Sequence, residues 1–453
     1  MEKIRVVHTN DLHSHFEEWP KISRYIKQAR EQDPDLLLFD IGDFMDKWHP
    51  LTEATDGQIN IDLMNEAGYN AVTIGNNEGI GNSHDQLQHL FDHAQFDVIL
   101  DNLYQKNGQR PKFAQPYKIM ETHAHHKVGI IGMTACYPLT YGPNGWSIKE
   151  VDEVLPGVIA ELKAQKVSAI ILLSHLGLPT DRRLAKAYPE LDLILGSHTH
   201  HLLPQGEQVN RTMLAAAGKY GQNIGDVQLT FADDGTVSNI IVKTIPTESL
   251  SEKRTDEGQI QEWLTKGHKQ LQKEKVAELP QKFEDAEETY QVLLKGVAKQ
   301  AETDLAILNS GLAVTPFNSG MITYDDLHQS LPHPMHLIRV KLSGYNLWRL
   351  IREMEKMRLF LSHYPMKGMG FRGKIFGDIK YLGIEYDAKT KQVFVKGKPL
   401  ELGEIYTLTT VDHYFFIPFF PTIEITGDVE FLFPEFLRDS VNHYLKETYP
   451  IKE

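Results

Sequence analysis

The sequence predicts an α/β fold in more than one domain. The chain has 453 residues, which is too long for a single hydrophobic core, so we expect two domains. In the first half, short apolar segments alternate with segments of helical periodicity, as they do in layered α/β proteins. Several apolar segments also end in Asp, Asn or His, and in such sheets ligands gather at the strand ends. A functional site is therefore expected along one edge of the first domain's strands.

Seven apolar segments predict the strands of the first domain. They are residues 4–7, 35–43, 71–78, 98–102, 127–135, 167–173 and 191–195, with polar residues closing the second and third. Helices are predicted at 19–32, 59–67 and 151–166. In the first, Ile22, Tyr25, Ile26 and Ala29 fall on one face, and Gly68 ends the second as a C′ residue.

The remaining segments define the domain boundaries. Residues 227–231 and 240–244, separated by the turn residues Asp233-Asp234-Gly235, predict a hairpin that closes the first domain, 1–246. The charged segment 247–279 has helical periodicity, and we expect it to be a solvated connecting helix. From residue 280 to 453 the pattern indicates a second domain of mixed helices and strands.

Composition excludes some classes of function. The chain has 61 acidic and 47 basic residues, a formal charge of −14, which argues against a non-specific nucleic-acid binder or a basic membrane-surface protein. No apolar run approaches membrane-spanning length, and no secretory signal is visible at the N-terminus. Cys136 is the only cysteine, so a disulfide framework is impossible. Together these features predict a cytoplasmic protein.

The polar strand ends carry candidate metal ligands. Asp11 and His13 are two residues apart, so on an extended backbone they point the same way, and His198 and His200 repeat this spacing. Further oxygen and nitrogen donors follow other strands, at Asp43, Asn76 and His175. Two divalent ions about 3.5–4 Å apart need this inventory, with one carboxylate shared between them.

The same residues form motifs that resemble the metallophosphoesterase signature. They are D-x-H at 11–13, G-D-x-x-D at 42–46, G-N-x-E at 75–78, S-H-x-G at 174–177 and G-x-H-x-H at 196–200. The opening H-T-N-D-L-H at 8–13 is typical of the 5′-nucleotidase family of this calcineurin-like superfamily. Segments between 308 and 344 are similar to that family's substrate domain. Without a visible leader, the chain resembles the short bacterial branch of the family, the YunD-like proteins.

The resemblance implies a fold, a metal centre and a reaction. The fold is a four-layer α/β/β/α sandwich, a connecting helix and an α+β substrate domain. Asp43 bridges two divalent ions, whose identity (Mn, Zn, Co or Mg) stays open. One ion has the ligands Asp11, His13, Asp43 and His200, and the other has Asp43, Asn76, His175 and His198. A hydroxide bridging the ions attacks the phosphorus of a phosphate ester.

One motif departs from the family pattern. The third motif usually contains a histidine that faces the phosphate, whereas this chain has Asn77. An amide can donate a hydrogen bond, but it carries neither a proton for transfer nor a charge, so we expect Asn77 to act in catalysis with reduced help to poor leaving groups. If another group replaces the missing histidine, His49 and His84 are the nearest candidates in sequence.

The substrate domain also departs from the pattern. Val314 stands where the family often has Arg, and residues 411–420 replace a glycine-rich turn. We expect Asn309 to contribute to the substrate site. Within 371–377, Arg372 and Lys374 offer positive charge for a phosphate, and Phe371 and Phe376 offer rings for stacking.

These expectations lead to one main hypothesis and two alternatives. The main hypothesis is a two-metal hydrolase of small phosphate esters, with nucleotides as the expected substrates and neither nucleic acid nor membrane as a partner. A phosphodiesterase or pyrophosphate-type hydrolase is an alternative, because a better leaving group tolerates Asn77. The other alternative is a metal-loaded ligand-binding protein with little turnover. The sequence does not indicate the oligomeric state.

Overall fold

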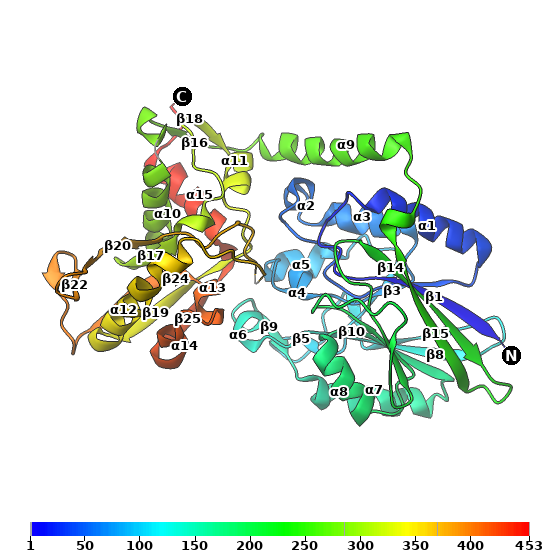
Figure 1. The fold of residues 1–453 in the computed structure, drawn as a ribbon. Coiled ribbons are helices and arrows are strands. Elements are labelled where there is room, and N and C mark those ends of the chain that lie inside the picture. The colour runs from blue at the N-terminus through cyan, green and yellow to red at the C-terminus, as the bar shows by residue number, and fades with distance from the viewer. Residues whose placement is uncertain (1, 285, 369, 453) are drawn as a thin grey trace. The chain divides into compact units, whose positions relative to one another are not determined.

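Two β-sheets lie at the centre of the N-terminal part of the chain. The computed structural model describes residues 2–284, 286–368 and 370–452, and it divides into two units, Met1–Gly267 and His268–Glu453 (Figure 1). In the first unit a seven-stranded sheet has the order β15-β14-β1-β2-β3-β4-β6. Its strands are β1 (Lys3–Thr9), β2 (Leu37–Asp40), β3 (Ala71–Val72), β4 (Asp97–Ile99), β6 (Ala114–Gln115), β14 (Asn223–Phe231) and β15 (Val237–Pro246).

The second sheet of this unit has six strands in the order β12-β13-β11-β10-β8-β7. They are β7 (Tyr117–Glu121), β8 (Lys127–Thr134), β10 (Ala169–His175), β11 (Leu193–Gly196), β12 (Glu207–Val209) and β13 (Thr212–Ala215). The inner strands β8, β10, β11 and β13 run parallel, as do β1, β2, β3, β4 and β6 in the first sheet. Each sheet therefore presents a row of carboxyl strand ends. A separate pair, β5 (Leu103–Gln105) and β9 (Trp146–Ile148), lies outside both sheets.

Helices cover the outer faces of the two sheets and complete four layers. One layer contains α1 (Trp19–Gln32), α3 (Gln58–Ala67) and α5 (His84–Leu90), and the opposite layer contains α7 (Val151–Ala164) and α8 (Leu178–Ala187). Short helical segments at α2 (Pro50–Ala54), α4 (Asn76–Gly79) and α6 (Pro138–Tyr141) occupy the connections. The α/β/β/α sandwich implied by the family resemblance is confirmed.

Burial on β1 shows how the layers hold together. Ile4 and Val6 belong to the apolar cluster between the two sheets, whereas Val7 belongs to the cluster under α1 and α3. Alternate side chains of one strand thus pack into two different cores, because successive strand residues point to opposite faces. This is why the predicted strands are continuous apolar runs rather than alternating patterns.

The charged segment after the hairpin is only partly the helix we expected. A short 3₁₀ turn, η1 (Thr247–Ser249), precedes α9 (Arg254–Leu271), and residues 275–279 form strand β16 (Lys275–Leu279). The prediction of a fully solvated helix is wrong, because Trp263 is buried and its ring packs against Phe16 at 5.6 Å. A single apolar stripe among many charges is enough to bury one face of a helix when a partner surface exists.

The second unit combines a mixed sheet with packed helices. Its five-stranded sheet has the order β20-β17-β24-β19-β25, in which only β17 and β24 pair in parallel. The strands are β17 (Ala306–Asn309), β19 (His336–Ser343), β20 (Ile379–Leu382), β24 (Ile405–Val411) and β25 (Asp428–Phe436). Smaller sheets are formed by β16 with β18 (Gly320–Thr323), and by β21 (Ile384–Asp387), β22 (Gln392–Val395) and β23 (Lys398–Pro399).

The helices of this unit enclose one large apolar core. They are α10 (Ala286–Gln300), α11 (Tyr324–Ser330), α12 (Gly344–Leu361), α13 (His413–Phe416), α14 (Pro421–Thr426) and α15 (Leu437–Thr448), with 3₁₀ turns η2 (Gln281–Glu284) and η3 (Ser310–Leu312). The expected α+β character is present. Among the described residues of the whole chain, no helix is both long and apolar enough to cross a membrane.

Candidate metal centre

The predicted ligands of the first unit meet at the carboxyl ends of its parallel strands. Asp11 and His13 follow β1, Asp43 follows β2, and His198 and His200 follow β11, while His175 is the last residue of β10. They form two groups of three, Asp11–His13–His200 and Asp43–His175–His198. Within each group the potential ligand atoms lie within 4.8 Å of one another. Residues up to 189 positions apart in sequence thus converge because β1, β2, β10 and β11 end at neighbouring positions.

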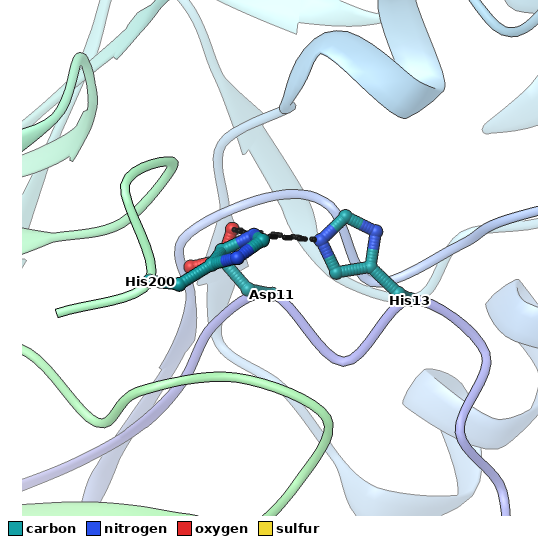
Figure 2. Close-up of side chains that lie close together, drawn as sticks. All are labelled: Asp11, His13 and His200. Carbon is teal, nitrogen blue, oxygen red and sulfur yellow. Dashed lines mark hydrogen bonds and ion pairs between the residues drawn. The ribbon is translucent and has the colours of Figure 1, made fainter. Parts of the chain in front are cut away.

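The first group is a carboxylate with two imidazoles (Figure 2). The Nε2 atoms of His13 and His200 are 3.1 Å apart, and Asp11 Oδ1 lies 3.5 Å from His200 Nε2 and 3.9 Å from His13 Nε2. Asp11 and His13 are buried, whereas the side chain of His200 is 31% exposed. One carboxylate oxygen and two imidazole nitrogens facing one point are suitable ligands for Zn, Mn or Co.

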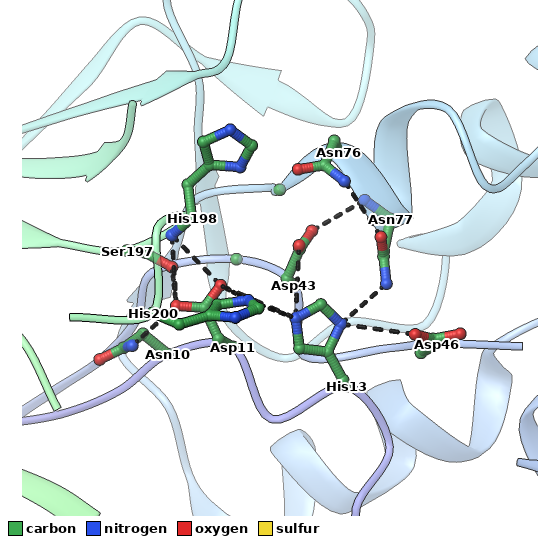
Figure 3. A network of polar contacts seen from close by, with 12 residues as sticks. Asn10, Asp11, His13, Asp43, Asp46, Asn76, Asn77, Ser197, His198 and His200 are labelled. Atoms are coloured by element: carbon green, nitrogen blue, oxygen red, sulfur yellow. Dashed lines mark hydrogen bonds and ion pairs between the residues drawn. The ribbon is translucent and has the colours of Figure 1, made fainter. Parts of the chain in front are cut away.

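Asp43 links the first group to the second. Its Oδ2 lies 3.7 Å from His13 Nε2, as Figure 3 shows. The same oxygen lies 3.5 Å from His175 Nε2, so one carboxylate oxygen faces both groups. Asn76 Oδ1 is 3.3 Å from His175 Nε2, which adds an amide oxygen to the second group. The Asp43 carboxylate thus lies in the position that a carboxylate shared by two ions must take.

The backbone around the ligands has unusual conformations. Asp11, His13, Asp43, His198 and His200 all have positive φ, between 50° and 73°. Non-glycine residues adopt this left-handed region rarely and at a cost, and they persist where the surrounding structure holds them. Here the loops hold one another: Asp11 N–H donates to Gly42 O at 3.1 Å and His13 N–H donates to Asp43 O at 2.8 Å.

Gly75 allows the backbone to come close to the Asp43 side chain. A Cβ atom on Gly75 would overlap the Asp43 carboxylate, so only glycine fits beside that side chain. The Gly in the G-N-x-E motif therefore serves packing beside the Asp43 carboxylate.

The second nitrogens of the imidazoles support the proposed ligand atoms. His175 Nδ1 donates to Ile41 O at 2.8 Å, which leaves Nε2 directed at Asp43. His13 Nδ1 lies 3.5 Å from Asp46 Oδ2, which leaves its Nε2 for the first group. Histidines that bind metals are usually oriented in this way by a carbonyl or carboxylate. The donor set therefore fits two divalent cations.

The electrostatic interactions within the cluster also favour bound cations. Burial opposes ionisation of Asp43, but the neighbouring His175 and His13 outweigh it and hold the pKa of that carboxyl well below its usual range. Burial lowers the pKa of His175, but the Asp43 carboxylate raises it to about 9. Burial and the adjacent His175 lower the pKa of His198 to about 4. The carboxylates thus favour positive charge at the position between the two groups.

Several supporting residues were not among the predicted site residues. Asn10 Nδ2 and Ser197 Oγ both donate to Asp11 Oδ2, at 2.8 and 2.7 Å. Tyr137 places its hydroxyl 2.6 Å from His198 Nε2. Asn10 and Ser197 lie next to predicted ligands within the metallophosphoesterase motifs, so the sequence could have indicated them. Nothing in the local sequence indicates that Tyr137 reaches the site.

Glu78 connects the loops that carry Asp43 and Asn76. Its carboxylate is buried and accepts hydrogen bonds from the backbone N–H groups of Asp43 (2.9 Å), Gly75 (2.8 Å) and Met45 (3.0 Å). Glu78→Gln replaces one acceptor oxygen by a donor and leaves buried N–H groups without a partner. The loops around the bridging carboxylate should therefore loosen.

We expect Glu78→Gln to lower the free energy of unfolding of the first unit by about 2 kcal/mol. Urea denaturation followed by tryptophan fluorescence measures this, because four of the five tryptophans lie in that unit. Glu66→Gln, on the exposed face of α3, is the matched control and should unfold like the unchanged protein. Equal midpoints for all three proteins would show that the Glu78 hydrogen bonds do not stabilise the loops.

Asn77 lies beside the first group. Its Nδ2 is 2.9 Å from His13 Nδ1, and its backbone N–H donates to Asp43 Oδ1 at 2.8 Å. The two histidines considered as replacements have other contacts. The His49 side chain accepts from Leu51 N–H and caps α2, while the His84 ring packs at a tilt against Trp146 at 4.3 Å and contacts Gln105. His49 and His84 therefore act in local packing, and the catalytic role of Asn77 stays a prediction.

Some predicted substrate residues of the second unit are buried, and others are at least partly exposed. The buried ones are Phe371, Phe376 and Asn309. Phe376 is fully buried against Tyr414, and the ring of Phe371 stacks between His333 and His413. Asn309 is buried too, and its amide donates to the carbonyl of Phe376.

Both rings are buried in contacts with His333, His413 and Tyr414, and stacking of Phe371 or Phe376 on a ligand stays a prediction. Arg372 is partly exposed and Lys374 is exposed, so a phosphate contact at these two side chains remains a prediction.

Comparisons with known proteins agree with the geometry. A family model described as calcineurin-like phosphoesterase matches residues 4–202, and one described as 5′-nucleotidase, C-terminal domain, matches residues 244–416. The uncharacterized metallophosphoesterase YunD of Bacillus subtilis (strain 168) is 37% identical over 97% of this chain and 98% of its own length. A 5′-nucleotidase of Vibrio parahaemolyticus is 26% identical over 90% of this chain and 82% of its own.

A solved structure extends the likeness to the fold. The crystal structure of a 5′-nucleotidase precursor from Thermus thermophilus matches with a TM-score of 0.62 and 20% identity, covering 100% of this chain and 97% of that one. At this identity the match concerns the fold alone.

Proposed function

Because this chain belongs to the calcineurin-like metallophosphoesterases that carry a 5′-nucleotidase C-terminal domain, we propose that it hydrolyses phosphate esters of nucleotides or related metabolites at a two-metal centre. The observation that carries the proposal is the position of Asp43. One of its carboxylate oxygens lies within 3.7 Å of an imidazole from each candidate ligand group.

The distances support the ligand assignment. Asp11, His13 and His200 would hold one ion, His175, His198 and Asn76 would hold the other, and Asp43 would be shared. Bound divalent ions would supply Lewis acidity, which lowers the pKa of water and offsets the charge of phosphoryl oxygens. The metal identity stays open among Mn, Zn, Co and Mg.

The chain's own residues contribute orientation. Asn10 and Ser197 fix the Asp11 carboxylate, and Ile41 O fixes the ring of His175. Asn77 stands next to His13, with its side-chain amide 2.9 Å from His13 Nδ1, and an amide has no proton to transfer to a leaving group. The residues present therefore support attack on phosphorus more than departure of a poor leaving group.

A nucleotide substrate is supported by the relatives. The Vibrio protein that aligns with most of this chain is named a 5′-nucleotidase, and the match to the C-terminal domain of that family covers residues 244–416. We propose that residues 1–246 supply the metal centre, that 280–453 supply substrate specificity with Arg372 and Lys374 as phosphate contacts, and that 247–279 connect them. A cytoplasmic location is proposed as well, since the single cysteine excludes an intrachain disulfide.

A second candidate function is favoured by Asn77. A phosphodiester or pyrophosphate bond releases a better leaving group than a nucleoside, so it needs less protonation. Such a substrate would use the same metal ligands.

A phosphate-release screen tests the proposal and separates the candidates. The full chain is supplied with Mn, Co, Zn or Mg and then given nucleoside monophosphates, diphosphates and cyclic phosphates. We expect metal-dependent release from at least one nucleotide class, with chelation by EDTA abolishing it. Turnover of diphosphates or cyclic phosphates alone would favour the second candidate. No release under any metal would contradict hydrolysis and favour a metal-loaded binding protein.

A further inference from the structure

The imidazole of His198 is held differently from those of the other ligands. His175 uses a backbone carbonyl for its second nitrogen, and His13 faces a carboxylate. His198 instead meets a phenol: the Tyr137 hydroxyl lies 2.6 Å from Nε2, and the two rings are 5.8 Å apart at 53°. Tyr137 comes from the connection between β8 and α6, an element that carries none of the predicted ligands.

This contact determines which nitrogen is available to an ion. A ring nitrogen with a hydroxyl at 2.6 Å is not accessible to a metal on the same side, so Nδ1 is the nitrogen left for the Asp43–His175–His198 group. A metal binds the lone pair of an unprotonated nitrogen, and the other ring nitrogen then carries the proton. In that state Nε2–H donates to the Tyr137 oxygen.

We propose that Tyr137 is a positioning residue of the metal centre: its hydroxyl oxygen accepts from His198 Nε2–H and holds the tautomer in which Nδ1 binds the second ion. This inference rests on the proposed function, because it takes His198 as a metal ligand. Tyr137 acts through His198 and needs no contact with the substrate. Its role corresponds to that of Ile41 O toward His175, with a side chain in place of the backbone.

The Tyr137 hydroxyl can be removed by substitution, whereas a backbone carbonyl cannot. The Tyr137 residue is 40% exposed, and it is the last residue of the connection 135–137, directly before Pro138 of α6. Removing only the hydroxyl with Tyr137→Phe leaves the ring against His198 and should not disturb the core. Outer partners of metal-bound histidines typically change metal affinity by about 10–100-fold when they are removed.

The matched control is Tyr220→Phe. The Tyr220 ring packs edge-on against His13 at 5.7 Å, beside the first ligand group, and its backbone N–H donates to Asp11 O in a contact that the substitution keeps. Both variants remove one phenolic oxygen from the surroundings of the metal centre. They differ in which ligand group they neighbour and in the contact to His198.

Calorimetric titration of the metal-stripped full chain with Zn²⁺ measures the affinities directly. We expect two binding events in the unchanged protein and in Tyr220→Phe. In Tyr137→Phe we expect one of the two to weaken by about 10–100-fold while the other keeps its affinity. Unchanged isotherms in Tyr137→Phe would overturn the inference and leave the proposed function intact. Absence of zinc binding in the unchanged protein would overturn both.

Nitrogen NMR of the zinc-loaded protein, labelled in its histidines, reports which ring nitrogen of each histidine is protonated. If Tyr137 had only a structural role, its substitution would not change these signals. His198 should show a protonated Nε2 with a slowly exchanging hydrogen, and in Tyr137→Phe that hydrogen should exchange fast or disappear. His175, which keeps its carbonyl partner, should have the same signals in both proteins. A His198 signal with a protonated Nδ1 in the unchanged protein would overturn the assignment.

Discussion

Asp43→Ala is expected to remove metal from both ligand groups and to lower phosphate release by at least about 10³-fold, because the shared carboxylate contributes to both sites and metal catalysis is worth several kcal/mol. The expectation follows from one oxygen, Asp43 Oδ2, which faces His13 and His175 at 3.7 and 3.5 Å. Elemental analysis after reconstitution should give about two divalent ions per chain for the unchanged protein. It should give markedly less than one for the variant.

Asp192→Ala is the control for Asp43→Ala. Asp192 is also a buried carboxylate, but it immediately precedes β11, at the opposite end of that strand from His198 and His200, and it accepts from Ile170 N–H. Its loss should cost stability without changing the metal content. Retention of one full equivalent of metal by Asp43→Ala would show that the carboxylate serves a single ion and is not shared.

Asn77→His is expected to accelerate hydrolysis of poor leaving groups selectively. With Asn77, an activated aryl phosphate should react well and a nucleoside monophosphate slowly, since the amide cannot protonate the departing oxygen. Restoring an imidazole should raise the nucleoside monophosphate rate by about 10–100-fold, which is at or below the lower end of the roughly 10²–10⁴-fold range for a positioned general acid. The aryl phosphate rate should change little.

The surroundings of Asn77 explain why the gain is expected to be partial. Gly79-Ile80-Gly81 follows the motif, so this segment offers no acid to orient the new imidazole. The structure nevertheless places Asp46 against the same His13 nitrogen that Asn77 contacts, at 3.5 Å (Figure 3). A carboxylate is thus close enough to orient part of the imidazole population, in competition with His13.

The measurement is the ratio of the two rates under one metal, in the unchanged protein, Asn77→His and Asn77→Gln. The glutamine variant keeps an amide and should leave the ratio unchanged. If the unchanged protein already hydrolyses nucleoside monophosphates as fast as the aryl ester, and the histidine leaves the ratio unaltered, another group assists the leaving oxygen. His49 and His84 are poor candidates for that group, because one caps α2 and the other packs on Trp146.

The layered fold and the candidate metal ligands could be predicted from the sequence for local reasons. A strand buried on both faces reads as a nearly continuous apolar run, and β8, β10 and β11 contain such runs, whereas Arg5 interrupts the shorter apolar segment of β1. Polar residues directly after such a run have to lie at the carboxyl edge of a parallel sheet. The D-x-H and G-x-H-x-H spacings then specify pairs of donors before any long-range contact is known.

Contacts between distant segments were decided only by the tertiary structure. Tyr137 reaches His198 and Trp263 reaches Phe16 across 61 and 247 residues, and the rings of Phe371 and Phe376 are buried by partners from several elements. The sequence by itself determined which residues can bind metal and on which edge they lie, because both depend on periodicity and on neighbours along the chain. Which imidazole nitrogen faces an ion, and which aromatic ring faces solvent, depends on packing between elements, which local sequence does not encode.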